Sequence, residues 1–140
     1  MARKLVVEAD GGSRGNPGVA AGGSLVIDAA TGEIIAELGA YVGIATNNVA
    51  EYTGMLEGVR RALTIDPNAE IHVRMDSKLV VEQMAGRWKI KHPDMQKLAV
   101  EARSLIAGRP VTFEWIPRAE NSRADALANR SMDMKQSFGL

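Results

Sequence analysis

Hydrophobic and polar positions in the first third of the chain form short alternating or continuous apolar segments, which is the pattern of β-strands. A short apolar run leads to Asp10, and two further strand-like segments lie on either side of the turn at residues 28–32. Antiparallel strands can be joined by short turns, so we expect these three segments to pair as an antiparallel meander. This part of the chain predicts one antiparallel side of a sheet.

The rest of the chain predicts helices that alternate with shorter strands. Apolar residues recur at intervals of three and four over residues 46–65, where Thr46 begins the pattern as a helix cap. The predicted helices are residues 46–65, 77–86, 93–108 and 121–136, and the predicted later strands are residues 71–75 and 111–117. Residues 137–140 are expected to be frayed.

This order of elements predicts one α/β domain over residues 1–140. We expect a mixed five-stranded sheet, with three antiparallel strands followed by two parallel strands, flanked by about four helices, because β-α-β connections run right-handed and parallel. A length of 140 residues and a hydrophobic content of 46% suffice for a single core. The sequence gives no reason to expect a second domain within it.

The composition limits the chemistry that the chain can carry. Seventeen basic residues balance seventeen acidic residues, so any affinity for nucleic acid must be local. There is no cysteine, and the two histidines, His72 and His92, are too few and too separated for a histidine cage. A catalytic metal would therefore have to be held by oxygen.

Neither end of the chain reads as a targeting or membrane segment. The apolar stretch before Asp10 is too short for the core of a signal peptide, and no apolar run approaches the length that spans a bilayer. We expect a soluble, cytoplasmic protein without a membrane partner.

Residues 6–18 combine an acid with an unusual density of turn-forming residues. Asp10 follows the apolar run, and four glycines come within the next eight positions. Such glycines would let the main chain take positive φ and present bare N–H groups to a ligand, whereas the simpler alternative is a hairpin turn. Neither GxGxxG nor GxxxxGK[ST] fits this stretch, so no small-molecule nucleotide cofactor is expected.

Four carboxylates lie at the ends of predicted elements, and each has a structural alternative. Asp10 could be a turn residue, Glu51 could form a capping box with Asn48, Asp76 could cap its helix, and Asp125 could bond within the first turn of the last helix. Taken together they favour a metal site, because acids that converge without a basic partner repel one another unless a divalent cation lies among them. The all-oxygen ligand set indicates Mg²⁺ or Mn²⁺.

Four segments around these acids resemble type 1 ribonuclease H, in the family's order and over nearly the full length of the chain. They are EADGGSRGNPG (residues 8–18), TNNVAEYTG (46–54), MDSKLVV (75–81) and ENSRADALAN (120–129). The chain most resembles the actinobacterial branch, in which such a domain can precede a C-terminal phosphatase-like domain in a longer chain.

The resemblance implies a ribonuclease H-like fold and hydrolysis of the RNA strand of RNA–DNA hybrids. It implies that Asp10, Glu51, Asp76 and Asp125 bind two Mg²⁺ ions, with Mn²⁺ as a substitute, and that the products carry 5′-phosphate and 3′-hydroxyl ends. The substrate-binding positions that it implies are Gly12, Ser13, Gly15 and Asn16 in the glycine stretch, Thr46, Asn47 and Asn48 before the long helix, and Ser77.

The sequence departs from many family members in the loop before Asp125. Those members carry a histidine there that helps the product to leave, but residues 117–120 contain none. Arg118 is the candidate that replaces it in part, and the alternative is an ordinary surface arginine.

A second departure lies between the helices that end near residue 86 and begin at residue 93. The basic helix that some members use as a substrate handle is absent, and residues 87–92 form a short basic connector instead. We expect Trp88, Lys89 and Lys91 to contact the DNA strand of the hybrid, since an aromatic ring among cations suits a sugar-phosphate backbone. The alternative is that Trp88 belongs to the core.

Two other functions remain open from the sequence. One is a nuclease of the same fold that also cuts double-stranded RNA, and the other is a nucleic-acid-binding module without catalytic activity. The presence of all four acids speaks against the second.

Overall fold

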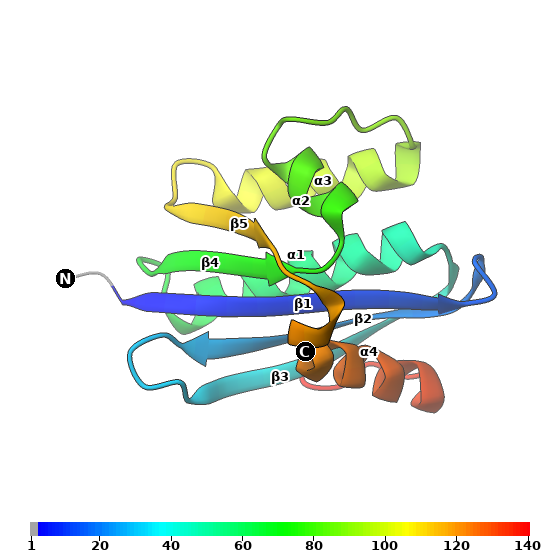
Figure 1. Cartoon of the computed structure of the whole chain (residues 1–140), viewed down its shortest axis with the longest axis horizontal. Helices are drawn as coiled ribbons and strands as arrows, with labels where there is room; N and C mark the ends of the chain where they lie inside the picture. Colours follow the sequence, from blue (N-terminus) through cyan, green and yellow to red (C-terminus); the bar gives the residue numbers. More distant parts are fainter. Residues whose placement is uncertain (1–2) are drawn as a thin grey trace.

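The computed structural model describes residues 3–140, so the first two residues of the predicted domain lie outside it. Five strands and four α-helices follow one another as the sequence predicts, with one short 3₁₀ helix before the last α-helix (Figure 1). The strands are β1 (Lys4–Arg14), β2 (Gly18–Asp28), β3 (Ile34–Ala45), β4 (Glu70–Met75) and β5 (Val111–Trp115). The helices are α1 (Asn47–Ile65), α2 (Lys78–Met84), α3 (Pro93–Ile106), η1 (Arg118–Glu120) and α4 (Ser122–Met134).

The strands form one mixed sheet in the order β3-β2-β1-β4-β5. β1 pairs antiparallel with β2 and β2 with β3, whereas β4 is parallel to both β1 and β5. The predicted fold class is therefore confirmed. β1 is the central strand. Its neighbour β2 belongs to the antiparallel half of the sheet, and its neighbour β4 belongs to the parallel half.

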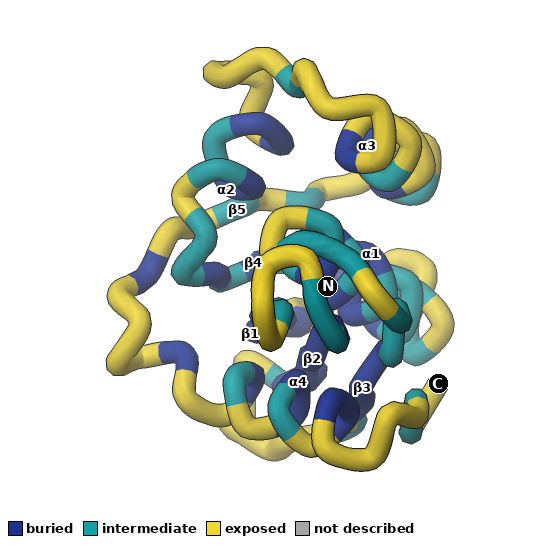
Figure 2. Tube along the Cα trace, turned by 90° about the vertical axis from the view of Figure 1, so that its right-hand side faces the viewer, coloured by how far each residue is buried: buried dark blue, intermediate teal, exposed yellow. Residues whose placement is uncertain are grey.

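Helices cover both faces of this sheet (Figure 1). Two adjacent glycines of β2 face opposite sides of the sheet. Gly22 lies against the backbone of α1 on one face, and Gly23 lies against the backbone of α4 on the other. The larger core cluster fills the α1 side, where buried residues of α1 such as Tyr52, Met55 and Val59 pack with those of β1, β4 and α3. In Figure 2 the trace of β2 is drawn as buried, and its residues 20–27 are buried, whereas the edge strand β5 has no buried residue.

β1 does not end at Asp10, which corrects the expectation of a glycine-rich loop directly after this acid. The strand continues through Gly11 and Gly12 to Arg14, and only residues 15–17 form the turn. A Cβ at Gly11 would lie 2.2 Å from the backbone carbon of Ala50. Gly11 is thus needed for the close approach of α1, and the hairpin alternative describes the stretch better.

The C-terminal residues are held to the sheet, so the expectation of fraying there is wrong. Phe138 and Gly39 exchange two backbone hydrogen bonds of 2.9 and 3.0 Å, and the hydroxyl of Ser137 accepts a hydrogen bond from the backbone N–H of Tyr41. The Arg130 guanidinium lies 4.2 Å from the centre of the Phe138 ring, at cation–π distance. These contacts fasten the chain end against β3.

No helix within residues 3–140 is long and apolar enough to cross a membrane.

Candidate active site

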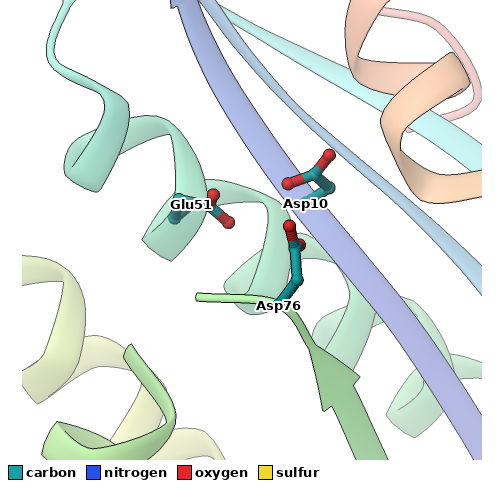
Figure 3. Close-up of side chains that lie close together, drawn as sticks. All are labelled: Asp10, Glu51 and Asp76. Atoms are coloured by element: carbon teal, nitrogen blue, oxygen red, sulfur yellow. The ribbon is translucent and has the colours of Figure 1, made fainter. Parts of the chain in front are cut away.

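Three of the four predicted acids meet beside the central strand. Asp10 projects from β1, Glu51 from the first turns of α1, and Asp76 from the residue after β4 (Figure 3). One carboxylate oxygen of each lies within 4.8 Å of those of the other two. The group therefore has the spacing that a metal ion with oxygen ligands requires.

The sheet register and one glycine bring these acids together. Because β4 is parallel to β1 and Met75 pairs with Ala9, the residues that follow them, Asp76 and Asp10, lie side by side, with Asp76 just past the end of β4 and Asp10 still within β1. Gly11 lets α1 lie directly on β1, which places Glu51 of this helix next to Asp10. Two structural alternatives are wrong, since Thr46 rather than an Asn48–Glu51 box caps α1, and Ser77 rather than Asp76 caps α2.

The acids are crowded and lack cationic partners. Burial, followed by the nearby charge of Asp76, raises the pKa of Asp10 to about 8, and burial also raises the pKa of Glu51 well above its ordinary value. Among the described residues, none of the four predicted acids forms an ion pair. The buried Oε2 of Glu51 has no hydrogen-bond partner. Such a site is suited to a divalent cation, which would neutralise the charges and occupy the free oxygen.

Asp125 and Arg118 lie in the same cleft as the three acids. Asp125, in the first turn of α4, is close enough to Asp10 to contribute to its raised pKa, although it lies outside the 4.8 Å group. Arg118 lies on η1 and is exposed. The cleft has a volume of about 380 Å³ and is lined by Asp10, Gly11, Gly12, Ser13, Arg14, Asn47, Glu51, Asp76, Arg118, Asp125, Ala128, Asn129 and Met132.

The β1–β2 turn and the start of α1 are tied to each other at one side of the cleft. The Ser13 hydroxyl donates a 2.6 Å hydrogen bond to the carbonyl of Ala45, and the Asn16 side-chain oxygen accepts one of 3.0 Å from the backbone N–H of Asn47. The predicted substrate residues of the two segments therefore share one rim. Gly15 lies in the turn, Thr46 is the cap of α1, Asn48 is exposed in its first turn, and Ser77 caps α2 beside Asp76.

The connector between α2 and α3 lines a different groove. Trp88 is 45% exposed, so the alternative of a core tryptophan is wrong. Lys89 and Lys91 are exposed as well, and no helix lies between Met84 and Pro93. The groove, of about 470 Å³, is lined by Gly86, Trp88, Lys89, Ile90, Gln96, Val100 and Arg103 and shares no residue with the acidic cleft.

Sequence reasoning missed several residues of the site. Arg14 and Asn129 line the cleft and are joined by a 3.3 Å hydrogen bond, while Arg14 also forms an ion pair with Asp133. Asn121 is predicted only as the residue at which the last helix begins, but its side chain makes no capping bond and instead donates a hydrogen bond to Asp76. Arg14, Asn121 and Asn129 all lie within the motif segments, so the segments could have indicated them, but not their contacts.

Comparison with known proteins identifies the family. A family model described as reverse transcriptase-like matches residues 8–131. The solved N-terminal RNase H domain of Rv2228c from Mycobacterium tuberculosis is 51% identical, with a TM-score of 0.90 over 96% of both chains. RNase H1 from Halobacterium salinarum is 40% identical, with a TM-score of 0.87 over 94% of this chain and 98% of that one. The chain belongs to the ribonuclease H family.

Two further comparisons concern this member of the family. LC11-RNase H1, solved in complex with an RNA/DNA hybrid, is 36% identical, with a TM-score of 0.87 over 94% of this chain and 98% of that one. The full Rv2228c, described as a bifunctional protein, is 53% identical over 131 residues, which are 93% of this chain. This chain spans only 36% of the length of Rv2228c. The predicted resemblance to type 1 ribonuclease H and to its actinobacterial branch is confirmed.

Proposed function

We propose that this chain hydrolyses the RNA strand of RNA–DNA hybrids at the cleft that contains Asp10, Glu51, Asp76 and Asp125. The observation that carries the proposal is the convergence of three unpaired carboxylates within 4.8 Å in a ribonuclease H fold. The relative LC11-RNase H1, described in complex with an RNA/DNA hybrid, supports the choice of substrate.

Two Mg²⁺ ions, with Mn²⁺ as a substitute, are the cofactors that the four acids would hold. The residues fit this role, because they offer only oxygen atoms, the Glu51 Oε2 is buried without a partner, and no ion pair within residues 3–140 involves them. When bound, such ions supply Lewis-acid stabilisation of the phosphate and lower the pKa of an attacking water.

The protein's own contribution is to hold these carboxylates in fixed places. Asp10 is anchored in the middle of the central strand, Asp76 follows the neighbouring parallel strand, and Glu51 is placed by a helix that rests on that sheet. Rigid elements of this kind keep ligand positions within a fraction of an ångström. In the reaction, a water oxygen forms a bond to phosphorus as the bond to the ribose 3′ oxygen breaks. The water loses its proton to solvent and the 3′ oxygen gains one, which gives 5′-phosphate and 3′-hydroxyl ends.

The rim formed by the β1–β2 turn and the start of α1 is the proposed substrate-reading surface. Gly12, Ser13, Gly15 and Asn16 would face the RNA minor groove, and Thr46, Asn47, Asn48 and Ser77 would hold the other side of the hybrid. The Asn16 Nδ2 and the exposed amides of Asn47 and Asn48 can bond with 2′-hydroxyls, base edges or phosphates, because within residues 3–140 the Asn16 oxygen is the one side-chain atom of these three amides that makes a hydrogen bond.

The connector groove is the proposed second contact, with the DNA strand. The exposed Trp88 ring can pack on sugars while Lys89 and Lys91 neutralise phosphates. The buried Gln83 fixes this connector, since its side chain donates to the Lys89 carbonyl at 2.9 Å and accepts from the Tyr52 hydroxyl at 2.6 Å. The backbone next to Trp88 is therefore tied to the core while the Trp88 ring stays exposed.

Arg118 is proposed to assist departure of the cleaved phosphate. It is an exposed cation in the cleft that contains the four acids, placed on a single 3₁₀ turn just before α4. A guanidinium in that place can bind a phosphate with two hydrogen bonds.

A cleavage assay tests the proposal. One labelled RNA strand is presented in RNA–DNA and RNA–RNA duplexes, and a DNA strand in DNA–DNA, each with Mg²⁺, with Mn²⁺, with Ca²⁺ and with chelator. We expect cleavage of RNA in the hybrid with Mg²⁺ or Mn²⁺ and little with Ca²⁺, whose larger and more flexible coordination shell fits the reaction poorly. Rapid cleavage in chelator would refute the metal assignment, cleavage of RNA–RNA would widen the substrate class, and binding without cleavage would make the chain a binding module.

A phosphatase-like domain that follows this domain in a longer natural chain stays a prediction. The description of Rv2228c as bifunctional supports it.

A further inference from the structure

Asn121 joins the three elements that carry Asp10, Asp76 and Asp125. It is the residue before α4 and is only 1% exposed. Its side-chain nitrogen donates a hydrogen bond of 2.9 Å to the carbonyl of Ala9, next to Asp10 in β1, and one of 2.8 Å to Oδ1 of Asp76. Asp125 lies four residues further along, and its backbone N–H bonds to the Asn121 carbonyl. One small side chain therefore links β1, the end of β4 and the start of α4.

The contacts decide how the Asn121 amide is oriented. Both partners, a carbonyl and a carboxylate, can only accept hydrogen bonds, so the NH₂ group must face them and uses its two hydrogens there. The Asn121 oxygen is left buried without a protein partner. A buried polar atom without a partner destabilises the folded state. The fold tolerates this cost at a position where the side chain could otherwise have capped α4.

The bond to Asp76 restricts a carboxylate that little else restrains. Asp76 lies beyond the last residue of β4, is partly exposed, and forms no ion pair within the described chain. The Asn121 amide occupies one of its oxygens and so limits rotation of the group. Hydrogen bonds of this kind to metal-binding carboxylates fix their orientation, and their loss typically lowers metal affinity or activity about 10–100-fold.

We propose that Asn121 is a positioning residue that orients Asp76 for divalent cation binding, an inference that rests on the proposed function of the cleft. It acts through Asp76 and is not assigned contact with the substrate. The side chain must be an amide, because an aspartate of equal size would place an oxygen against the Ala9 carbonyl and the Asp76 carboxylate.

If Asn121 had a purely structural role, other contacts that hold α4 on the sheet should matter equally for the site. Arg123 provides a matched control. Arg123, also at the start of α4, fastens this helix to β1 by two hydrogen bonds of 3.1 and 2.9 Å to the buried Glu8. Within residues 3–140 its hydrogen bonds and its ion pair go to Glu8 and not to any of the four acids. If Asn121 only holds α4 on the sheet, Arg123→Gln should impair the site as Asn121→Ala does.

The experiment measures Mn²⁺ binding by calorimetry for the wild-type chain and for Asn121→Ala, Asn121→Asp and Arg123→Gln. Hybrid binding without divalent cations, the melting temperature and the Mg²⁺ dependence of single-turnover cleavage are measured alongside. We expect both Asn121 variants to weaken Mn²⁺ binding about tenfold or more and to shift the Mg²⁺ midpoint to higher concentration, with hybrid affinity nearly unchanged. Arg123→Gln should lower the melting temperature yet keep Mn²⁺ affinity within about twofold, because it leaves Asp76 untouched.

Wild-type Mn²⁺ affinity in a folded Asn121 variant would overturn the proposal, as would an equal loss of affinity in Arg123→Gln. If Asn121→Ala does not fold, Asn121→Asp preserves the side-chain volume and is judged by the same criterion. The Mn²⁺ titration needs no cleavage, so a wild-type chain that binds Mn²⁺ but does not cut hybrid would refute the proposed function while leaving the role of Asn121 to its own test.

Discussion

Asp10 pairs with Gly23 across the β1–β2 ladder, and Gly23 is the residue on which the backbone of α4 rests. A Cβ at Gly23 would lie 2.3 Å from the backbone nitrogen of Ala128 and 2.7 Å from the carbonyl oxygen of Ala124. No side chain fits between the sheet and the helix. The glycine opposite Asp10 therefore sets how closely the helix that carries Asp125 can approach.

This relationship predicts that Gly23→Ala is damaging although it removes no polar group. The added methyl group would push α4 outward, and such overpacking costs about 1–3 kcal/mol. We expect a lower melting temperature and a loss of cleavage, because Asp125 moves away from Asp10. Thermal melting and single-turnover cleavage check this result.

Gly12→Ala is the matched control for the stability part of that prediction. Its Cβ would meet only the flexible end of Met132, at 3.1 Å. The loss of stability should be clearly smaller than for Gly23→Ala. Equal melting temperatures for the two variants would show that helix packing on β2 is not the reason for the glycine.

Much of this architecture follows from local sequence patterns, and the parts that do not follow depend on contacts between distant segments. The apolar period of α1 and the alternation of β4 and β5 are written in consecutive residues, so their positions could be predicted. The continuation of β1 through Gly11 and Gly12 could not, because turn chemistry and close helix packing call for the same residue type. The docking of Phe138 on Gly39 joins residues almost a hundred positions apart, and no local pattern indicates it.

In the candidate site, too, some features could be predicted from the sequence and others depend on contacts between distant segments. The predicted element ends and the motif segments indicated the three acids, although Asp10 lies within β1 and not at its end. The hydrogen bond from Asn121 to Asp76 could not be predicted from the sequence, because an asparagine before a helix is expected to cap that helix. Tertiary contacts with the acidic centre replaced that local preference.

The raised pKa of Asp10 predicts that the metal-free protein loses stability as the pH rises. A carboxyl whose pKa is higher in the folded than in the unfolded chain binds protons more readily when folded, so stability falls between about pH 4 and the folded pKa of about 8. In chelator, the melting temperature should be lower at pH 8 than at pH 5. Asp10→Asn should reduce this difference and melt above wild type at pH 8, since it removes the charge from a buried cluster.

Glu33→Gln, at an exposed position between β2 and β3, is the control for the pH experiment, and its melting curve should follow that of wild type. Added Mg²⁺ or Mn²⁺ should raise the wild-type melting temperature at pH 8 more than that of Asp10→Asn. If Asp10→Asn instead melts below wild type at pH 8 without metal, Asp10 stabilises the fold and its assigned role is wrong.

Arg118→Ala should slow turnover more than it weakens hybrid binding. The guanidinium lines the acidic cleft, where it can bind the phosphate that leaves. We expect steady-state kcat to fall by about tenfold, with the dissociation constant for hybrid within about threefold of wild type. Arg118→Lys keeps the charge and should retain an intermediate rate. Equal losses in rate and affinity would make Arg118 an ordinary phosphate contact.

Gln83→Leu should loosen the connector without touching the cleft. The change removes the bonds of Gln83 to Tyr52 and to the Lys89 carbonyl, so the backbone after Trp88 loses its tie to the core and is held less tightly. We expect the Michaelis constant for hybrid to rise while single-turnover cleavage at saturating substrate stays near wild type. A fall in the saturated cleavage rate, with an unchanged Michaelis constant, would contradict this view of the connector.

The connector itself provides the most direct test of how the hybrid is held. Trp88→Ala, Lys89→Ala and Lys91→Ala should each raise the Michaelis constant, because each removes one contact with the sugar-phosphate backbone. Each lysine variant should also reduce the slope of log affinity against log salt by about 1, because one phosphate contact is lost. Lys4→Ala, at the start of β1, removes the same charge from an exposed site and should leave the slope unchanged. Unaltered salt slopes in Lys89→Ala and Lys91→Ala would place the DNA strand elsewhere on the surface, since an exposed lysine that touches no phosphate releases no counterion when the hybrid binds.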